Sequence, residues 1–319
     1  MSNQVFTTTR QEFEHASAKY DVVPIRGVIE TLGVHPIDAF RALRTANNPA
    51  FIFESESPEA GASRYSYVCP TVENVIRTGE HELLGDIDPI SAMRNHFNSR
   101  TVSPINDLPE LITGVFGFIA YEAIKHFEPT VGELPADPTD SPVAALVVPS
   151  ELVVFDHALN QLHIIVFATQ ATDFEAAINR ITQICQTLES LPTRVDPNVD
   201  DNLASIHIGP QKKGAQHHFS DMVREARKAI IDGELIQVVL GQRVETQTTA
   251  DPVDIYEQLS TMNPSPYMYM LDLGDMQLIG ASPELMLRTN GNTAAVHPIA
   301  GTRPRGETAE EDLLNEAEL

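Results

Sequence analysis

The sequence predicts a globular chain that mixes α-helices with β-strands. Three patterns indicate this: apolar residues at helical spacing in residues 174–188, runs of β-branched residues on both sides of Pro149, and a strand–turn–strand pattern over residues 50–67. At 319 residues and 42% hydrophobic composition, the chain can bury a sizeable core as one large domain or two.

Composition narrows the class of protein. The formal net charge of -24 argues against nucleic acid and anionic membrane surfaces as partners. Two cysteines, Cys69 and Cys185, are too few for a disulfide framework or a four-cysteine zinc site. We therefore expect both to be small core residues and expect the protein to be cytoplasmic. The N-terminus is polar, and no apolar run approaches the roughly 20 residues that span a bilayer.

The first predicted elements are a short helix over residues 38–43 and a β-hairpin. The hairpin pairs residues 50–53 with residues 65–67 through an acidic tip that includes Glu54 and Ser55. Such a tip is either a solvated turn or part of a binding site.

Three further strands are predicted over residues 146–148, 151–157 and 162–166, because β-branched residues dominate each run. Asp156 and His157 lie where the second strand turns into the third. We interpret them as turn formers rather than as a catalytic pair.

A stretch rich in Pro, Gly and Asp separates two periodic parts of the sequence. It predicts an N-terminal region of residues 1–195, a linker of residues 196–214 and a second region of residues 215–319.

The second region is predicted to begin with a helix whose apolar face lies within residues 219–230. Gly233 follows it as a natural residue for ending a helix. Residues 235–244 are then predicted to form a strand, which carries Gln237.

Three motif blocks follow, and they read NPSPYM at residues 263–268, GASPE at 280–284 and PIAGTRPRG at 298–306. Each sets Gly, Pro or Ser beside a polar residue between apolar runs, which is typical of tight turns that deliver side chains into a cleft. Glu284 precedes the apolar residues 285–287, which we interpret as a buried strand. It is therefore either a partly desolvated carboxylate that holds a proton or a solvated edge residue.

These blocks, together with the residues IQVV at 236–239, resemble component I of anthranilate synthase, a member of the chorismate-utilising enzymes. Weaker similarity extends back to about Tyr20, but only the first part of the family's domain is covered. The resemblance implies an α+β fold in which two large antiparallel β-sheets pack as a sandwich with helices outside.

The resemblance also implies a function. The large subunit converts chorismate and ammonia, which a partner glutamine amidotransferase (component II) supplies, to anthranilate and pyruvate. This is the first step of tryptophan biosynthesis, and L-tryptophan inhibits it by feedback. By the same resemblance, Glu284 donates a proton to the leaving 4-hydroxyl, Gly301 and Thr302 contact chorismate, and Arg303 either clamps a carboxylate or stabilises a turn.

Two positions separate this reaction from related ones by resemblance. Gln237 stands where relatives that add water carry a lysine base, although a glutamine can equally bond neighbouring strands. Ala300 stands where aminodeoxychorismate synthases commonly carry a lysine that attacks the ring. Both positions favour anthranilate synthase over aminodeoxychorismate or isochorismate synthase.

A tryptophan site is implied at two of the segments. One wall is the hairpin tip with Glu54 and Ser55, and the other is the NPSPYM block; the alternative for the block is a proline-rich turn that packs on the core. The residues that the resemblance implies on the second wall are Asn263, Pro264, Ser265, Tyr267 and Met268.

The last segment, residues 308–311, fits a capping box that opens a helix. In the family, the Mg²⁺ ligands and a catalytic histidine come from downstream segments, so we expect no metal ligand in this chain and interpret it as a fragment that is incomplete alone. The alternative is a truncated, non-catalytic chain that binds tryptophan or a partner.

Overall fold

The computed structural model describes most of the chain, and its contacts divide the chain into two units, Met1–Arg194 with Pro252–Leu319, and Val195–Asp251. The described residues are 5–31, 33–54, 64–104, 112–132, 134, 139–169, 173–192, 194, 215–241, 243–299 and 301–319. The whole predicted linker, 196–214, therefore lies outside the described residues.

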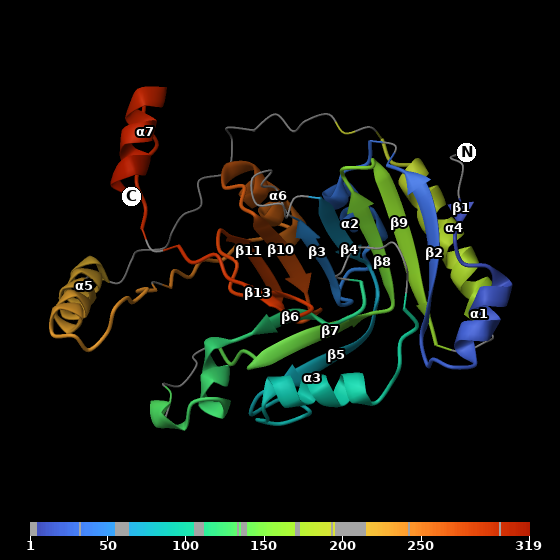
Figure 1. Ribbon diagram of the computed structural model, residues 1–319, viewed down its shortest axis with the longest axis horizontal. Coiled ribbons are helices and arrows are strands. Elements are labelled where there is room, and N and C mark those ends of the chain that lie inside the picture. The colour runs from blue at the N-terminus through green and yellow to red at the C-terminus, as the bar shows by residue number, and fades with distance from the viewer. Residues whose placement is uncertain are drawn as a thin grey trace. The chain divides into compact units, whose positions relative to one another are not determined.

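The first unit is organised around an eight-stranded antiparallel sheet (Figure 1). Its strands lie in the order β1 (Val5–Phe6), β2 (Val23–Glu30), β9 (Gln161–Ala168), β8 (Glu151–Asp156), β4 (Tyr65–Cys69), β3 (Ala50–Glu54), β10 (Tyr267–Asp272) and β11 (Gln277–Ser282). Strands from the two motif-bearing parts of the sequence thus become neighbours, because β3 pairs directly with β10.

Two smaller antiparallel sheets complete the unit. One has the order β5 (Val72–Thr78), β7 (Ala144–Pro149) and β6 (Phe116–Ile119), and the other pairs β12 (Arg288–Asn290) with β13 (Thr293–Ala295). Gly117 of β6 lies so close to the Ala145 carbonyl of β7 that a Cβ there would collide with it. Glycine is therefore required at position 117, where β6 pairs with β7.

The eight-stranded and three-stranded sheets pack face to face. Their shared core joins Phe51 and Leu152 of the larger sheet with Phe116 and Val147 of the smaller one, and the rings of Phe51 and Phe116 stack with their centroids 4.6 Å apart. Side chains of β8 alternate between this core and the opposite face, so β8 is buried on both sides. This explains why its sequence is a continuous apolar run.

Helices cover the other face of the large sheet. They are α1 (Arg10–Ser17), α2 (Pro36–Leu43), α4 (Phe174–Glu189) and α6 (Pro252–Met262), and buried residues of all four belong to one core cluster with the sheet. Helix α3 (Pro89–Asn98) packs on the outer face of the three-stranded sheet through Ala92. The short 3₁₀ helices Tyr121–His126 and Pro129–Val131 and the helix α7 (Ala309–Glu318) complete the unit.

The fold class is confirmed: antiparallel sheets pack together with helices outside. The predicted hairpin is β3–β4, the three central strands are β7, β8 and β9, and residues 174–188 lie in α4. Asp156 forms the predicted turn, because its carboxylate accepts hydrogen bonds from the N–H groups of Ala158 and Leu159, both at 3.1 Å. Cys69 and Cys185 are buried core residues, as predicted.

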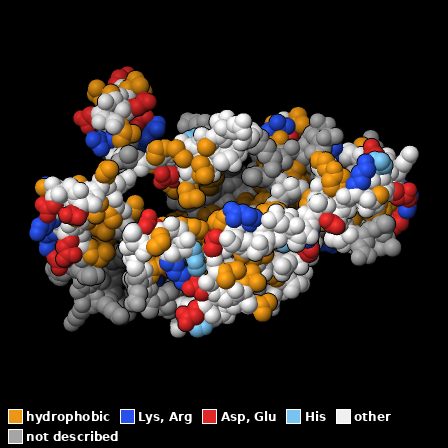
Figure 2. Space-filling model, turned by 60° about the horizontal axis from the view of Figure 1, so that its bottom comes forward, with side chains coloured by type: hydrophobic (Ala, Val, Ile, Leu, Met, Phe, Trp, Pro, Cys, Tyr) orange, Lys and Arg blue, Asp and Glu red, His pale blue; other side chains and the backbone are white. Residues whose placement is uncertain are grey.

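The face on which α3 lies is brought forward in Figure 2, where acidic, basic and hydrophobic side chains are intermixed. In the described part of the chain, no helix combines the length and the apolar character needed to cross a bilayer.

The second unit contains helix α5 (Ala215–Ile231), which confirms the helix predicted there. Gly233 adopts a positive φ of 79° just past its end, and the N–H of Glu234 bonds to the carbonyl of Ala229 at 2.9 Å. The strand predicted over residues 235–244 is wrong: the described residues there form no strand, and Ile236 is 96% exposed. Apolar residues alone do not make a strand, because a strand also requires a neighbour that takes its hydrogen bonds.

Candidate functional site

Three buried motif residues, Glu54, Ser265 and Met268, lie where β3 ends and β10 begins, beside helix α6. We call this the β3–β10 corner and define it by these three residues, the exposed Asn263 and the buried Tyr256 of α6. Glu54 and Met268 are directly opposite each other on the two strands, so their side chains share a face, and that face is the one α6 covers.

Local sequence explains the path of the chain into this corner. Helix α6 buries Val253 and Tyr256, which are three residues apart on one face. The N–H of Asn263 makes the last helical bond, to the carbonyl of Leu259 at 2.9 Å, and the prolines of the NPSPYM block prevent the helix from continuing. The chain then turns at once into β10.

The carboxylate of Glu54 is buried at this corner, where only 7% of the residue is exposed. Its Oε1 accepts a hydrogen bond from the Tyr256 hydroxyl at 2.6 Å, a separation typical of an O–H donor on a charged acceptor. Ser265 is buried as well, and its hydroxyl lies 3.4 Å from the Asn263 carbonyl. The corner therefore combines apolar side chains with a few placed polar groups, as small-molecule sites do.

Aromatic side chains occupy the opposite face of the same strands. The ring of Tyr269 meets the ring of Phe53 edge-on, with centroids 6.4 Å apart, and it lies over Gly280, where a Cβ would collide with it. Tyr267, which is also half-buried, lies on this face of β10 because side chains alternate along a strand. The predicted tryptophan-site residues thus divide between the two faces of the sheet.

Two other residues of the predicted tryptophan site remain. Pro264 is exposed, and Ser55 lies outside the described residues. Sequence reasoning did not single out Tyr256, although the apolar spacing of Val253, Tyr256 and Leu259 indicates a buried helix face. A buried tyrosine hydroxyl usually has a hydrogen-bond partner, and that is the signal that could have found it.

A second group of motif residues lies along residues 283–306. The short β12–β13 hairpin folds the GASPE block back onto the PIAGT block: the N–H of Ile299 donates to Glu284 Oε1 at 3.3 Å, and the N–H of His297 donates to the Leu285 carbonyl at 3.3 Å. The two blocks that carry the predicted catalytic residues are therefore adjacent.

This second group is exposed. Glu284, Gly301 and Thr302 all lie at the surface, and the buried strand predicted over residues 285–287 is wrong, because Met286 is 87% exposed. Among the described residues, this stretch is supported by the three-residue strands of the β12–β13 hairpin, which provide no second layer to bury those apolar side chains.

The arginines of the last block contact the C-terminal helix. Arg303 Nε lies 3.6 Å from Glu318, and Arg305 pairs with Asp312 at 2.6 Å. Thr308 caps this helix as predicted, with its hydroxyl accepting from the N–H of Glu311 at 3.2 Å. These contacts correspond to the turn-stabilising alternative for Arg303.

Gln237 lies in the second unit, where it is exposed, and Ala300 lies outside the described residues. Within the described ranges, no three or more His, Cys, Asp or Glu side chains cluster in a way that could hold a metal ion. The described residues therefore do not fit the Mg²⁺ that the family resemblance implies.

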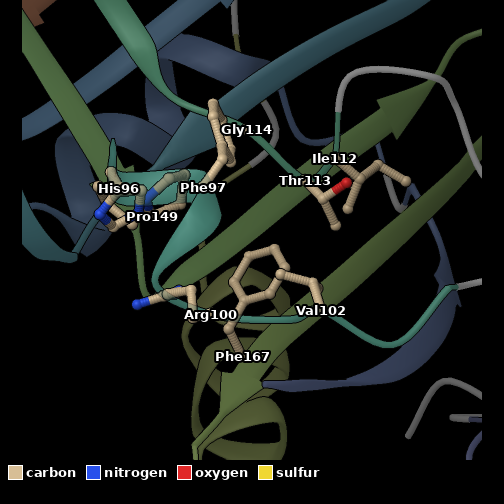
Figure 3. A pocket seen from close by; sticks show the side chains of 10 residues that line it. His96, Phe97, Arg100, Val102, Ile112, Thr113, Gly114, Pro149 and Phe167 are labelled. Atoms are coloured by element: carbon tan, nitrogen blue, oxygen red, sulfur yellow. The ribbon is translucent and has the colours of Figure 1, made fainter. Parts of the chain in front are cut away.

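A separate cavity of about 350 Å³ lies beside the end of α3 (Figure 3). His96, Arg100, Thr113 and Phe167 are among its lining residues, and none of the predicted site residues is. Arg100 already binds the Glu73 carboxylate through two hydrogen bonds of 2.5 and 2.8 Å. Burial, and then the nearby Arg100 charge, lower the pKa of His96, so the cavity offers little uncompensated charge to a ligand.

Proteins similar in sequence to this chain include two anthranilate synthase components. Anthranilate synthase component 1 of Streptomyces coelicolor is 34% identical over 314 residues, which cover 94% of this chain and 58% of that protein. The probable anthranilate synthase component 1 of Schizosaccharomyces pombe is 32% identical over 304 residues, covering 92% of this chain and 60% of that protein.

A solved structure is also similar to this chain. The crystal structure of anthranilate synthase component I from Streptococcus pneumoniae TIGR4 matches with a TM-score of 0.55 and 28% identity, covering 81% of this chain and 58% of that one. The chain thus spans 58% to 60% of the length of these relatives. Since residues 50–319, which include every motif block described above, match the family of chorismate binding enzymes, the chain belongs to that family.

Proposed function

We propose that this chain is part of the large subunit of an anthranilate synthase, which converts chorismate and ammonia to anthranilate and pyruvate. The observation that carries the proposal is the contact between Glu284 and the N–H of Ile299, which brings the GASPE and PIAGT blocks together. The names of the relatives described above support the same reaction. They also support a partner, a component II amidotransferase that releases ammonia from glutamine.

In the proposed reaction, ammonia forms a bond to C2 of chorismate while the bond from C4 to its hydroxyl breaks. Glu284 donates the proton with which that hydroxyl leaves as water. The bond from C3 to the enolpyruvyl oxygen then breaks as the C2 proton is lost, which makes the ring aromatic, and the methylene carbon of the released enolpyruvate takes up a proton to give pyruvate. Gly301 and Thr302 follow Ile299 in the chain and would contact the ring near the leaving group, since glycine allows close backbone approach.

Two sequence positions favour this reaction over its relatives. Gln237 is a neutral amide, so it cannot act as the general base that water addition needs. Ala300 has no amine that could attack the ring. The proposal for the whole protein includes a bound Mg²⁺, which removal with a chelator and re-addition during the assay would test.

Replacing Glu284 tests the catalytic part of the proposal. In the intact enzyme, Glu284→Gln keeps the size and the backbone contact but removes the proton donor, so turnover should fall by roughly two to four orders of magnitude while chorismate binding changes by about a few fold. Anthranilate formation from chorismate and ammonium is followed by the fluorescence of the product. The exposed Glu310→Gln in the first turn of α7 is the matched control, and near-normal turnover of Glu284→Gln would remove Glu284 from the mechanism.

The second part of the proposal is an L-tryptophan effector site at the β3–β10 corner. A buried carboxylate on a strand end, Glu54, is suited to the ligand's ammonium group, and apolar side chains such as Met268 are suited to its indole. The burial of this corner also supports the alternative function, a chain that binds tryptophan without catalysis. An effector that inhibits must itself bind less well when chorismate is bound, and equal tryptophan affinity with and without saturating chorismate contradicts inhibition through this site.

A further inference from the structure

Tyr256 is the one residue of the β3–β10 corner that the family motifs do not include. It is completely buried, and its ring lies in the core that joins α6 to the large sheet. Its hydroxyl nevertheless lies 2.6 Å from Glu54 Oε1, 202 residues away in the sequence. Helix α6 thus delivers a hydroxyl group to a buried carboxylate beside apolar side chains.

Ion pairs on the outer side of α6 fix the helix that carries this hydroxyl. Arg41 of α2 pairs with Asp254 at 2.8 Å and with Glu257 at 3.0 Å. Arg194 pairs with Glu257 at 2.5 Å and with Asp38 of α2 at 3.2 Å. Asp254 and Glu257 flank Tyr256 in the sequence, so these pairs restrict both rotation and sliding of α6.

The two strands fix the carboxylate from the other side. Glu54 is paired with Met268 of β10, and the backbone of β3 is held further along by Phe53 opposite Tyr67 of β4. The hydrogen bond therefore joins two rigid elements, and it restricts the orientation of the Glu54 carboxylate. A group held in its binding orientation before the ligand arrives loses less conformational entropy when it binds.

We propose that Tyr256 is a positioning residue of the effector site: its hydroxyl orients the Glu54 carboxylate to receive the ammonium group of an amino-acid ligand. The inference rests on the proposed tryptophan site. It adds that recognition of the ammonium, rather than of the indole, depends on α6.

A purely structural role makes a different prediction. If Tyr256 only compensates a buried carboxylate, its loss lowers stability and weakens every ligand of the corner alike. If it orients Glu54, its loss weakens only ligands that carry an ammonium. The ratio of affinities for L-tryptophan and indole-3-propionate, which has the same ring and carboxylate but no ammonium, distinguishes these two roles.

The chain contains no tryptophan, so ligand fluorescence can be followed without an indole background from the protein. Both ligands are titrated into the wild-type chain, Tyr256→Phe and the control Tyr121→Phe, whose tyrosine is 78% exposed. We expect Tyr256→Phe to bind L-tryptophan about tenfold more weakly and indole-3-propionate equally well, since it loses one hydrogen bond to a charged group. Tyr121→Phe should match the wild-type chain for both ligands.

An unchanged affinity ratio in Tyr256→Phe overturns the inference while the tryptophan site stands. A wild-type chain that does not bind L-tryptophan overturns the site and the inference together. Should Tyr256→Phe fail to fold, Arg41→Gln removes two ion pairs of α6 and leaves the hydroxyl and carboxylate in place. It should lower the ratio by about two- to threefold, and an unchanged ratio overturns the inference in the same way.

Discussion

The β3–β10 corner and the segment of residues 283–306 both carry family motifs, yet they differ in how the described chain supports them. At the corner, Glu54, Tyr256 and Met268 are buried between two strands and a helix. In the segment, Glu284 and Thr302 are exposed on a small hairpin and the loop that follows it. A motif therefore identifies residue types, whereas packing decides which of them already form a binding geometry.

The two regions differ because their strands have different numbers of neighbouring strands and helices. Strand β10 bonds to β3 on one side and to β11 on the other, and α6 covers its face. Strands β12 and β13 bond only to each other over three residues each. Two-stranded ribbons are marginal in water, so we expect the corner to be rigid and the segment to move.

The largest expected difference comes from two methionines. Met268→Ala should lower the free energy of unfolding by about 2–5 kcal/mol, because Met268 is almost fully buried in the main core. Met286→Ala, at an 87% exposed position, should change it by less than about 0.5 kcal/mol. Urea unfolding of both variants measures the two values, and similar decreases in the free energy of unfolding would contradict the difference described between the regions.

Acid should act on the first unit through two histidines, His35 at the start of α2 and His163 of β9. Burial lowers the pKa of both, and for His35 the charge of Arg194 lowers it further. Below about pH 6.5 the unfolded chain therefore takes up protons that the folded histidines do not, and stability is lost as the pH falls toward the lowered folded values. The free energy of unfolding should therefore decrease between about pH 7 and pH 5.

Urea unfolding at a series of pH values measures this slope. His163→Leu should make it shallower, because a buried imidazole whose Nδ1 has no partner in the described structure is replaced by a group that does not titrate. A stability that stays flat or rises over that range contradicts the assignment.

The smallest expected effect comes from a pair of glycines. Gly280→Ala must displace the Tyr269 ring that lies over it, which separates Tyr269 from Phe53 and should cost about 1 kcal/mol. Gly301→Ala would bring a Cβ to 3.1 Å from Leu319 Cδ1, at the end of a flexible side chain, and should change stability by less than about 0.5 kcal/mol. Thermal unfolding of the two variants compares them, and an equal or reversed order would contradict the packing described for Tyr269 and Phe53.

The sequence predicted a helix or strand correctly where its residue pattern shows which sides of the element are buried. The apolar spacing in residues 174–188 predicts α4, and the β-branched runs around Pro149 predict β7 and β8, because each pattern states how many faces are buried. Residues 235–244 show where this reasoning fails: their apolar pattern indicates a capacity to pair, but no partner strand is specified by it.

The candidate site was likewise predicted only in part. The motif residues Glu54 and Met268 are brought together by strand pairing, and Glu284 is brought to the PIAGT block by a hairpin. The sequence left open whether Glu284 is desolvated or solvated, because desolvation depends on what covers a side chain and not on its sequence neighbours; the structure shows it exposed. Tyr256 was missed for a related reason: its partner lies 202 residues away.

Residue-resolved amide hydrogen exchange, with and without L-tryptophan, tests the central claim most directly. The account predicts slow exchange in β3, β10 and α6, fast exchange in residues 283–306, and further protection by L-tryptophan confined to the amides around Glu54 and Met268. Protection by the ligand at residues 283–306 instead, or equal exchange in the two regions, would contradict it.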